Sequence, residues 1–469
     1  MKHVHLIGIG GTGLSAIARV LLERGYTVSG SDREASPLFK AITAAGARTS
    51  LGHAADQIAG ADLVIRSSAI PEDNPEVIAA RQQGIPVLKR ADFLEELTKE
   101  KDTLAVAGSH GKTTTTAMLV WVLEALGADP SFIAGGIVNQ LGCNARSGSG
   151  VYFAIEADEY DSMFLGLAPK IAVITNIEHD HPDCFPTEAD YFSAFRDFLS
   201  RVRPDGLALV CYEDAQARQL ANSLDNAPFE VLTYGNSPES NYWAKDIQVV
   251  DGSPTFELKF QGPSGEKQSL GRAQLSLPGL HNVLNATAVL GVLHQLELPM
   301  EAAIKALGAF TGAGRRFEIL GQAGGVTIID DYGHHPTEIR ATLEAARSRY
   351  PDQRLWAVWQ PHTYSRTRIL ENAFIEALNK ADRAAVLKIF AAREVDSGYS
   401  AEKIADSLPN GKAVYLEDFS NAKDYLVAHL QPGDVAVVFS AGDATEVSRD
   451  VLAQLAAQDE AEKEVPHHG

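Results

Sequence analysis

Lys112 and Thr113 stand in the segment AGSHGKTTTT, residues 107–116, where a glycine precedes a lysine and a run of threonines. In phosphate-binding loops such a lysine contacts the β- and γ-phosphates of a nucleotide, and the following hydroxyl ligates Mg²⁺. The spacing differs from a Walker A loop, because only Ser109 and His110 separate the first glycine from the glycine–lysine pair. A predicted strand precedes the segment and a predicted helix follows it, which favours a shortened phosphate-binding loop over a simple glycine turn.

A second glycine-rich loop, GIGGTG at residues 8–13, matches the pattern G-x-G-x-x-G and also lies between a predicted strand and a predicted helix. Asp32 follows 19 residues after its last glycine, at the end of the next predicted strand. The backbone N–H groups of such a loop receive a pyrophosphate. The pattern recognises this group rather than nicotinamide, so an NAD-dependent oxidoreductase, an FAD protein and a UDP-sugar-binding protein remain open on this segment alone.

Acidic and histidine side chains follow two later predicted strands, in EADEYD (156–161) and TNIEHDHPD (175–183). The carboxyl ends of parallel strands meet at one edge of a sheet, so both segments should face the phosphate loop. Carboxylate and imidazole groups there could hold Mg²⁺ or Mn²⁺ against ATP. A solvated acidic loop is the alternative, and it suits Asp161 and Asp183 better than the strand-terminal Glu156.

The formal charge of the chain is −20, which argues against nucleic acid as a partner because a phosphate-backbone binder carries a basic face. Anionic substrates would therefore need cations concentrated at the site. The segments GAGRRFE and WQPHTYSRTR supply such cations: Arg315, Arg316, Arg366 and Arg368. The pair His334–His335 could bind a metal, but no nearby cysteine or third histidine supports that, so a structural or substrate-contacting role is favoured.

Short apolar runs alternate with helical patterns along most of the 469 residues, which predicts three α/β blocks with largely parallel sheets. Residues 1–100 are expected to form a Rossmann-like domain, and residues 101–314 a P-loop-type ATPase domain with a mixed sheet. A second Rossmann-like domain is expected over 315–457. A small antiparallel addition is expected within 236–272, and the charged tail 458–469 is expected to be disordered.

Three cysteines, Cys143, Cys184 and Cys211, lack CxxC spacing and suit a reducing compartment. The N-terminal stretch MKHVHLIGIGG is too interrupted by glycine and histidine for a signal peptide. No stretch approaches the roughly 18 uninterrupted apolar residues of a membrane helix. A cytoplasmic protein without membrane insertion is therefore predicted.

Taken in order, the motifs resemble the Mur ligases of bacterial cell-wall synthesis, and the resemblance covers nearly the whole chain. It rests on the segments HLIGIGGTGLSAIA, GSD, SSAI, GSHGKTTT, EADEYD, TNIEHDH, PGLHNVLNA, RRFE, DDYGHHPTEI and QPHTYSRT. The family has a UDP-sugar domain, an ATPase domain and a C-terminal domain that closes over ATP and receives the amino acid. Residues 185–202 contain no lysine where other branches carry a carbamylated one, which agrees with the alanine-adding branch.

The resemblance implies three groups of site residues. Those holding the UDP moiety would be Gly8, Gly10, Gly11, Thr12, Gly13, Ser31, Asp32, His53, Ser67, Ser68, Ala69 and Ile70. Those serving ATP would be Gly108, Ser109, His110, Gly111, Lys112, Thr113, Thr114, Asn282, Asn285, Arg316, Asp331 and Tyr332, with the two asparagines near adenine. The metal ligands would be Thr113, Glu156 and His181, while Lys112, Glu156, His181, His334, His362 and Arg366 would be catalytic, the last three holding the alanine.

The implied reaction is ATP-dependent. The lactyl carboxylate of UDP-N-acetylmuramate attacks the γ-phosphate, and the amine of L-alanine attacks the resulting acyl phosphate, with Mg²⁺ or Mn²⁺ as the metal cofactor. A monomer or a homodimer is expected.

The sequence departs from the family pattern at three positions. Thr363 stands where many relatives have arginine, which would place more of the alanine recognition on Arg366. Ser440 replaces a usual glycine, and Tyr160 replaces a small serine.

Three alternatives remain open. A ligase of the same family that attaches a recycled tripeptide to the same sugar nucleotide would share the fold. An NAD-dependent oxidoreductase would leave Lys112, Glu156 and His181 without a role. A non-catalytic UDP-sugar-binding regulator would need no intact phosphate loop.

Overall fold

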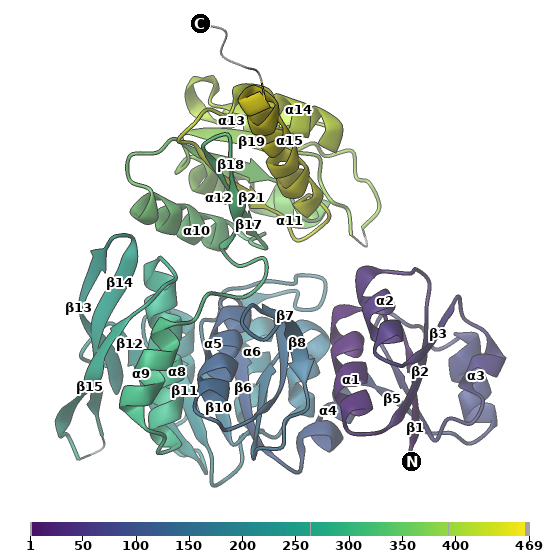
Figure 1. Ribbon diagram of the computed structural model, residues 1–469. Coiled ribbons are helices and arrows are strands. Elements are labelled where there is room, and N and C mark those ends of the chain that lie inside the picture. Colours follow the sequence, from purple (N-terminus) through teal and green to yellow (C-terminus); the bar gives the residue numbers. More distant parts are fainter. Residues whose placement is uncertain (1, 263, 393, 465–469) are drawn as a thin grey trace, which may run out of the picture. The chain divides into compact units, whose positions relative to one another are not determined.

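Three separate β-sheets, one in each predicted α/β block, organise the chain (Figure 1). The computed structural model describes residues 2–262, 264–392 and 394–464. Residue contacts group the chain into two compact units: Met1–Ile247, Phe256–Gln274 and Val283–Thr311 form the first, and Gln248–Thr255, Leu275–Asn282 and Gly312–Gly469 form the second. The first unit thus contains the N-terminal sheet and most of the second sheet, so the predicted boundary at residue 100 lies between two sheets of one unit and stays a prediction.

The N-terminal sheet is parallel, with strand order β3-β2-β1-β4-β5. Its strands are β1 His3–Ile7, β2 Thr27–Asp32, β3 Arg48–Leu51, β4 Leu63–Arg66 and β5 Val87–Lys89, and its helices are α1 Thr12–Glu23, α2 Pro37–Ala44, η1 Ala55–Ile58, α3 Pro75–Gln82 and α4 Arg90–Thr98. Side chains alternate across β4: Ile65 packs in the core that contains α1 and α2, whereas Val64 packs with Val77 of α3. Figure 1 shows α1 and α3 on opposite faces.

The second sheet has ten strands in the order β15-β14-β13-β12-β11-β10-β6-β9-β7-β8. Its strands are β6 Asp102–Ala107, β7 Ser131–Val138, β8 Cys143–Arg146, β9 Tyr152–Glu156, β10 Ile171–Ile174, β11 Leu207–Cys211, β12 Glu230–Gly235, β13 Tyr242–Val250, β14 Ser253–Gln261 and β15 Lys267–Gln274. Its helices are α5 Lys112–Ala125, η2 Tyr160–Gly166, α6 Glu188–Leu199, α7 Ala215–Asn222, α8 Leu280–Gln295 and α9 Met300–Gly308. Strands β9, β6, β10 and β11 are parallel neighbours, so their carboxyl ends form one edge.

The predicted antiparallel addition is present. Strands β13 and β14 are hydrogen-bonded neighbours joined only by Asp251 and Gly252, and so short a connection requires an antiparallel pair. Both residues have positive φ, 50° and 74°, as a type I′ turn requires. The hairpin β7–β8 was not predicted, because β7 carries two central glycines and no alternating pattern.

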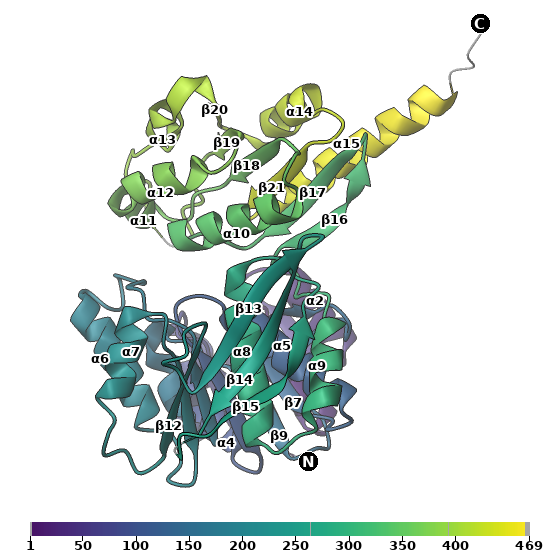
Figure 2. The same cartoon turned by 90° about the vertical axis from the view of Figure 1, so that its left-hand side faces the viewer.

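The C-terminal sheet has the order β16-β17-β21-β18-β19-β20, and only the β16–β17 pair is antiparallel. Its strands are β16 Glu318–Ala323, β17 Val326–Asp331, β18 Leu355–Trp359, β19 Arg383–Leu387, β20 Ala413–Leu416 and β21 Val435–Phe439. Its helices are α10 Pro336–Arg349, α11 Tyr364–Ile369, α12 Glu371–Leu378, α13 Glu402–Ser407, η3 Pro409–Gly411, α14 Phe419–His429 and α15 Thr445–Glu464. Figure 2 shows α15 running beside β16 and β17.

The expectation of a disordered tail from residue 458 is wrong for 458–464, which continue α15. Alanine, glutamate, glutamine and lysine are strong helix formers, and Asp459 accepts a hydrogen bond from the N–H of Gly324 over 2.6 Å. The rest of the predicted tail, 465–469, lies outside the described residues. Within the described ranges, no helix combines the length and the apolar character needed to cross a membrane.

Candidate active site

The glycine-rich loop after β1 is held by hydrogen bonds to the end of β2. The N–H of Gly8, at φ 90°, donates to the carbonyl of Ser31 over 2.8 Å. The N–H of Gly10 donates to Asp32 Oδ2 over 2.8 Å. Gly11 is the N-cap of α1 and has no side-chain oxygen to cover the first turn. The loop therefore offers the helix N-terminus that a pyrophosphate requires.

Two further predicted segments lie against this loop. The turn Ser67–Ile70 follows β4, and the N–H of Ser67 donates to the carbonyl of Ile7 over 3.0 Å. A Cβ on Gly8 would lie 3.2 Å from that of Ser67, so the two loops are in close contact. His53 follows β3, and its Nδ1 lies 3.0 Å from the Ser31 hydroxyl. The residues predicted for the UDP moiety therefore gather at the carboxyl ends of four strands.

Arg90, the first residue of α4, is a cation that the sequence analysis missed. Its guanidinium lies so close to Gly13 that a side chain at that position would overlap it. Arg90 also forms an ion pair of 3.2 Å with Asp158. Burial lowers the pKa of Arg90, against the attraction of Asp158. Nothing in the sequence VLKR distinguishes this arginine from a surface residue, so only the fold identifies it.

The phosphate loop needs glycine at both of its predicted positions. Gly108 has φ 139°, and a side chain there would overlap Thr175. Gly111 has φ 81° and is the N-cap of α5, and a Cβ on it would lie 2.9 Å from Asn285 Oδ1. The predicted adenine-side residue Asn285 thus lies beside the loop, whereas Asn282 belongs to the other compact unit.

Lys112, the first residue of α5, is folded back over the loop that precedes it. Its ammonium donates to the carbonyls of Gly108 and Ser109 and forms an ion pair of 2.9 Å with Glu159. Glu159 is only 1% exposed. Burial alone would lower the pKa of Lys112, but the attraction of Glu159 and Glu156 outweighs it and the pKa is raised. The lysine is therefore cationic and already oriented at the loop.

Glu156 ends β9 and contacts the same helix N-terminus from the neighbouring strand. The hydroxyl of Thr113 donates to Glu156 Oε1 over 3.0 Å, and the N–H of Gly135 donates to Oε2 over 2.6 Å. A hydroxyl and a carboxylate at this separation are suitable oxygen ligands for one hard divalent cation. The structure thus brings together two of the three predicted metal ligands.

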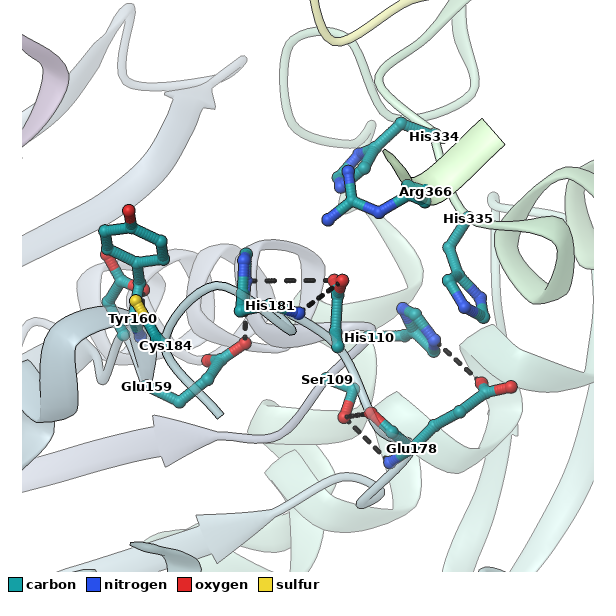
Figure 3. A network of polar contacts seen from close by, with 12 residues as sticks. Ser109, His110, Glu159, Tyr160, Glu178, His181, Cys184, His334, His335 and Arg366 are labelled. Carbon is teal, nitrogen blue, oxygen red and sulfur yellow. Dashed lines mark hydrogen bonds and ion pairs between the residues drawn. The ribbon is translucent and has the colours of Figure 1, made fainter. Parts of the chain in front are cut away.

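The third predicted ligand, His181, lies on the loop after β10. It adopts φ 54°, and its ring meets that of Tyr160 edge to face at 5.1 Å between centroids. Its Nε2 lies 3.6 Å from Glu159 Oε1 (Figure 3). Burial alone would raise the pKa of Glu159, but Lys112 and His181 outweigh it and the pKa is lowered. Glu159 therefore connects the phosphate-loop lysine with the predicted metal-binding histidine.

The other two residues of the shortened loop bind the loop after β10. The hydroxyl of Ser109 accepts from the N–H of Glu178 and lies 2.9 Å from the hydroxyl of Tyr191. His110 Nε2 lies 2.8 Å from Glu178 Oε2, as Figure 3 shows, and its N–H donates to Asn176 Oδ1 over 2.9 Å. These contacts give Ser109 and His110 a structural reason for their positions. Thr114, which is also among the residues predicted to serve ATP, is buried within α5.

In the second compact unit, Asp331 ends β17 and is buried. Its carboxylate accepts from the N–H groups of Phe317 and Gly333 over 2.8 and 2.7 Å. The next residue, Tyr332, lies under the guanidinium groups of Arg315 and Arg316, each 5.0 Å from the ring centroid. The predicted ATP residues of this unit, Arg316, Asp331 and Tyr332, therefore form one cluster.

The residues predicted to hold alanine lie beside that cluster. The rings of His334 and Tyr332 meet edge to face at 5.6 Å, and those of His334 and His362 lie 5.5 Å apart. His362 Nδ1 accepts a hydrogen bond from Arg366 over 3.1 Å. The imidazoles and the guanidinium thus follow the ends of two parallel strands, β17 and β18, which lie on either side of β21.

Two departures from the family pattern have structural counterparts here. Thr363 has φ 65° and ψ 146°, a conformation strained for a β-branched residue, directly between His362 and the start of α11. The hydroxyl of Ser440 donates to Gln360 Oε1 over 2.6 Å and accepts from the N–H of Gly442 over 3.0 Å. The serine thus links the loop after β21 to the end of β18.

Asp331 makes the stability of the protein depend on pH. Burial raises its pKa from 3.8 to about 6, although Arg316 and the two N–H donors oppose the shift and Glu338 adds to it. Because the folded pKa lies above the unfolded one, the protonated carboxyl stabilises the fold fully below about pH 4, and this contribution is lost as the pH rises through 6. Between pH 4 and pH 7, the free energy of unfolding of the wild type should fall by about 3 kcal/mol more than that of Asp331→Asn.

Urea titrations of the wild type and Asp331→Asn at half-unit steps from pH 4 to 7 measure this difference. Asp352→Asn, on the exposed loop after α10, is the matched control. A difference between wild type and Asp331→Asn that does not change with pH would contradict the prediction.

Three family models match consecutive parts of the chain. "Mur ligase family, catalytic domain" matches residues 3–102, "Mur ligase middle domain" matches 106–293, and "Mur ligase, glutamate ligase domain" matches 315–442. The chain belongs to the Mur ligase family. Each match covers one of the three sheets, except that β6 begins before the second match, and the order is that of the predicted blocks.

Similar Mur ligases include two that align over nearly their whole length. The UDP-N-acetylmuramate–L-alanine ligase of Sorangium cellulosum is 41% identical over 98% of this chain and 97% of its own. That of Geobacter sulfurreducens is 39% identical over 97% of this chain and 98% of its own.

Two solved Mur ligase structures have similar folds. A UDP-N-acetylmuramate–alanine ligase from Thermotoga maritima has a TM-score of 0.82 at 29% identity and covers 98% of this chain and 100% of its own. A murein peptide ligase from Psychrobacter arcticus has a TM-score of 0.69 at 25% identity, with 97% and 99% covered. The predicted three-domain α/β fold is therefore confirmed.

Glu159 is a residue of the candidate site that the sequence analysis did not select. The segment EADEYD offers four acids, and the strand-terminal Glu156 was preferred because of its position. The structure shows that Glu159 is the carboxylate that pairs with Lys112. The spacing of residues in the sequence could not reveal this pairing. Glu159 lies directly before the short helix η2, in which Asp161 and Ser162 have positive φ, so the segment follows neither a helical nor a strand pattern.

Proposed function

We propose that the chain is an ATP-dependent ligase that joins L-alanine to the lactyl carboxylate of UDP-N-acetylmuramate. The observation that carries the proposal is the 41% identity to an alanine-adding Mur ligase over 98% of this chain. The arrangement of the phosphate loop supports an ATP-dependent reaction, because Lys112 is cationic and oriented at the N-terminus of α5. The glycine loop after β1 supports the binding of a UDP-linked sugar, because it offers a second helix N-terminus to a pyrophosphate.

In this proposal Lys112 neutralises charge on the transferring phosphoryl group while the lactyl carboxylate attacks it. The ammonium exchanges its contacts with Glu159 and with the loop carbonyls for phosphate oxygens. Positioning and charge neutralisation supply most of the rate enhancement in such reactions, so no covalent enzyme nucleophile is required. Arg90 lies where it would neutralise the UDP pyrophosphate beside Gly13.

The donor set around α5 fits a divalent cation such as Mg²⁺ or Mn²⁺. Thr113 and Glu156 would hold it through oxygen, and His181 would contribute a ring nitrogen to the same region. When bound, such an ion neutralises phosphate charge during phosphoryl transfer. The hydrogen bond from Gly135 orients Glu156 for this role.

The second compact unit would supply the amino-acid end of the reaction. Arg366 carries the cation suited to the carboxylate of alanine, and His334 and His362 flank it. Asp331 and Tyr332 would contact the ribose and base of ATP, with Arg316 near a phosphate. The L-alanine amine would then attack the acyl phosphate, and phosphate would leave.

Phosphate release should require ATP, a divalent cation, UDP-N-acetylmuramate and L-alanine together. The measurement is a coupled phosphate assay in which alanine is replaced by serine, glycine or the tripeptide L-alanyl-γ-D-glutamyl-meso-diaminopimelate, which a structural neighbour is named for. A titration with NADH is the control. It tests the oxidoreductase alternative and should show no binding. Turnover with the tripeptide equal to that with alanine would contradict the assignment.

A further inference from the structure

Glu76 of α3 is a fully buried carboxylate beside the predicted sugar-nucleotide site. Its exposure is 0%. Oε2 lies 2.7 Å from His5 Nε2 and accepts from the Ser31 hydroxyl over 2.8 Å. Oε1 lies 3.0 Å from His53 Nδ1. Burial alone would raise the pKa of Glu76, but its hydrogen bonds to His5 and Ser31 outweigh that effect and the pKa is lowered.

A chain of hydrogen bonds continues from His5 across β1 and β2. His5 Nδ1 lies 2.8 Å from the Ser29 hydroxyl, which lies 2.7 Å from His3 Nε2. His3 Nδ1 lies 2.8 Å from the carbonyl of Gly60. A carbonyl can only accept, so His3 Nδ1 carries a proton. Arg48 donates to His3 Nε2 over 3.3 Å, so that nitrogen is an acceptor.

Counting protons along this chain assigns the donors and acceptors. Since His3 Nε2 accepts, Ser29 gives its one proton to His3 and must accept from His5 Nδ1. His5 Nε2 then faces a carboxylate and needs a second proton to make that hydrogen bond. The contact is therefore a hydrogen bond that shares this proton between His5 Nε2 and Glu76 Oε2, so no unbalanced charge is buried.

The same carboxylate determines the tautomer of His53. An ionised carboxylate can only accept, so His53 Nδ1 carries the proton and donates to Glu76 Oε1. In neutral His53 the other ring nitrogen, Nε2, is then a hydrogen-bond acceptor. Nε2 is buried and has no hydrogen-bond partner among the described residues. The neighbouring Gly52 donates its N–H to the carbonyl of Asp32 over 2.8 Å, so His53 stands beside the end of β2.

In nucleotide-binding sheets with this strand order, the acidic residue at the end of the second strand contacts the ribose of the nucleotide. In this chain that residue is Asp32. We propose that Glu76 is a positioning residue that keeps His53 in the Nδ1–H tautomer, so that Nε2 accepts a hydrogen bond from a hydroxyl or N–H donor of the nucleoside. The proposal rests on the proposed binding of a UDP-sugar at this sheet. A buried acceptor rejects ligands that lack the matching donor, so the pair Glu76–His53 would contribute to nucleotide specificity.

Glu76→Gln is the first test. The amide oxygen should remain with the two donors His5 and Ser31, which leaves the amide N–H directed at His53 Nδ1. The proton of His53 then moves to Nε2, and the acceptor becomes a donor. The KM for UDP-N-acetylmuramate should rise about 10- to 100-fold. The kcat and the KM values for ATP and alanine should stay within about twofold of wild type.

Long-range ¹H–¹⁵N NMR of the histidine rings reads the tautomer directly, with His53→Asn identifying the resonance. The wild-type protein should show the proton on Nδ1, and Glu76→Gln should show it on Nε2. A wild-type His53 protonated on Nε2 would overturn the proposal even if Glu76→Gln failed to fold. This measurement needs no ligand, so it stands apart from the proposed function.

A double-mutant cycle on the affinity for UDP separates a positioning role from a general structural one. If Glu76 acts through His53, the double variant Glu76→Gln/His53→Asn should bind UDP as weakly as His53→Asn alone. Full additivity of the two effects would overturn the proposal. Comparison of UDP with 2′-deoxy-UDP indicates whether the donor is the ribose hydroxyl or the base. Glu95→Gln, an exposed glutamate of α4, is the matched control and should bind UDP as wild type does.

Discussion

Lys112→Met should lose about 10³-fold or more in kcat, with a smaller change in the KM for ATP. The ammonium is the cation at the N-terminus of α5, and removal of such a group costs stabilisation that is realised mainly in the transition state. The variant should also be less stable, because it leaves Glu159 buried without its 2.9 Å partner. Breaking a buried ion pair from one side costs about 3 to 5 kcal/mol.

A second substitution separates these two effects. Glu159→Gln in the Lys112→Met background removes the uncompensated carboxylate, so the free energy of unfolding should recover while kcat stays low. Lys99→Met, at the exposed end of α4, is the control for loss of a surface lysine. Turnover of the Lys112→Met enzyme above a tenth of wild type, measured by phosphate release, would contradict the role assigned to Lys112.

Glu156→Gln should lower kcat by about 10²- to 10³-fold and weaken divalent-cation binding by about 10²-fold. The amide oxygen of glutamine can still accept from the N–H of Gly135, and the amide N–H can donate to the hydroxyl of Thr113, so the geometry of β9 should survive. What the variant loses is the negative charge.

Titration of Mn²⁺ by electron paramagnetic resonance, with a non-hydrolysable ATP analogue present, measures the effect of Glu156→Gln on the metal without relying on turnover. Glu188→Gln, an exposed glutamate in the first turn of α6, is the matched control. Unchanged Mn²⁺ affinity in Glu156→Gln would show that Glu156 is not a ligand.

Much of the fold could be predicted from local sequence patterns, because the tertiary structure keeps the strands and helices that these patterns indicate. The three sheets lie where alternating apolar runs predicted them, and both glycine loops lie between a strand and a helix. Elements without such a pattern were missed. Strand β7 is held by pairing with β8 and β9. The end of α15 is held by the hydrogen bond between Asp459 and Gly324, two residues far apart in the sequence.

The site was predicted less completely than the fold, for a physical reason. Motifs identify residues whose spacing is local, such as Lys112 and Thr113. The partners that set their charge come from other strands, and spacing cannot reveal which acid is buried. Glu159 and Arg90 became recognisable only when η2 and α4 placed them beside the two loops.

The ion pair between Lys112 and Glu159 implies a thermodynamic coupling between the nucleotide and the divalent cation. A phosphate that takes the ammonium of Lys112 releases Glu159, which is 1% exposed and lies near Glu156 and His181. The released negative charge favours uptake of a cation in the same region. By linkage, each ligand should raise the affinity for the other by the same factor. The loop is therefore expected to bind nucleotide and metal together more tightly than either one alone.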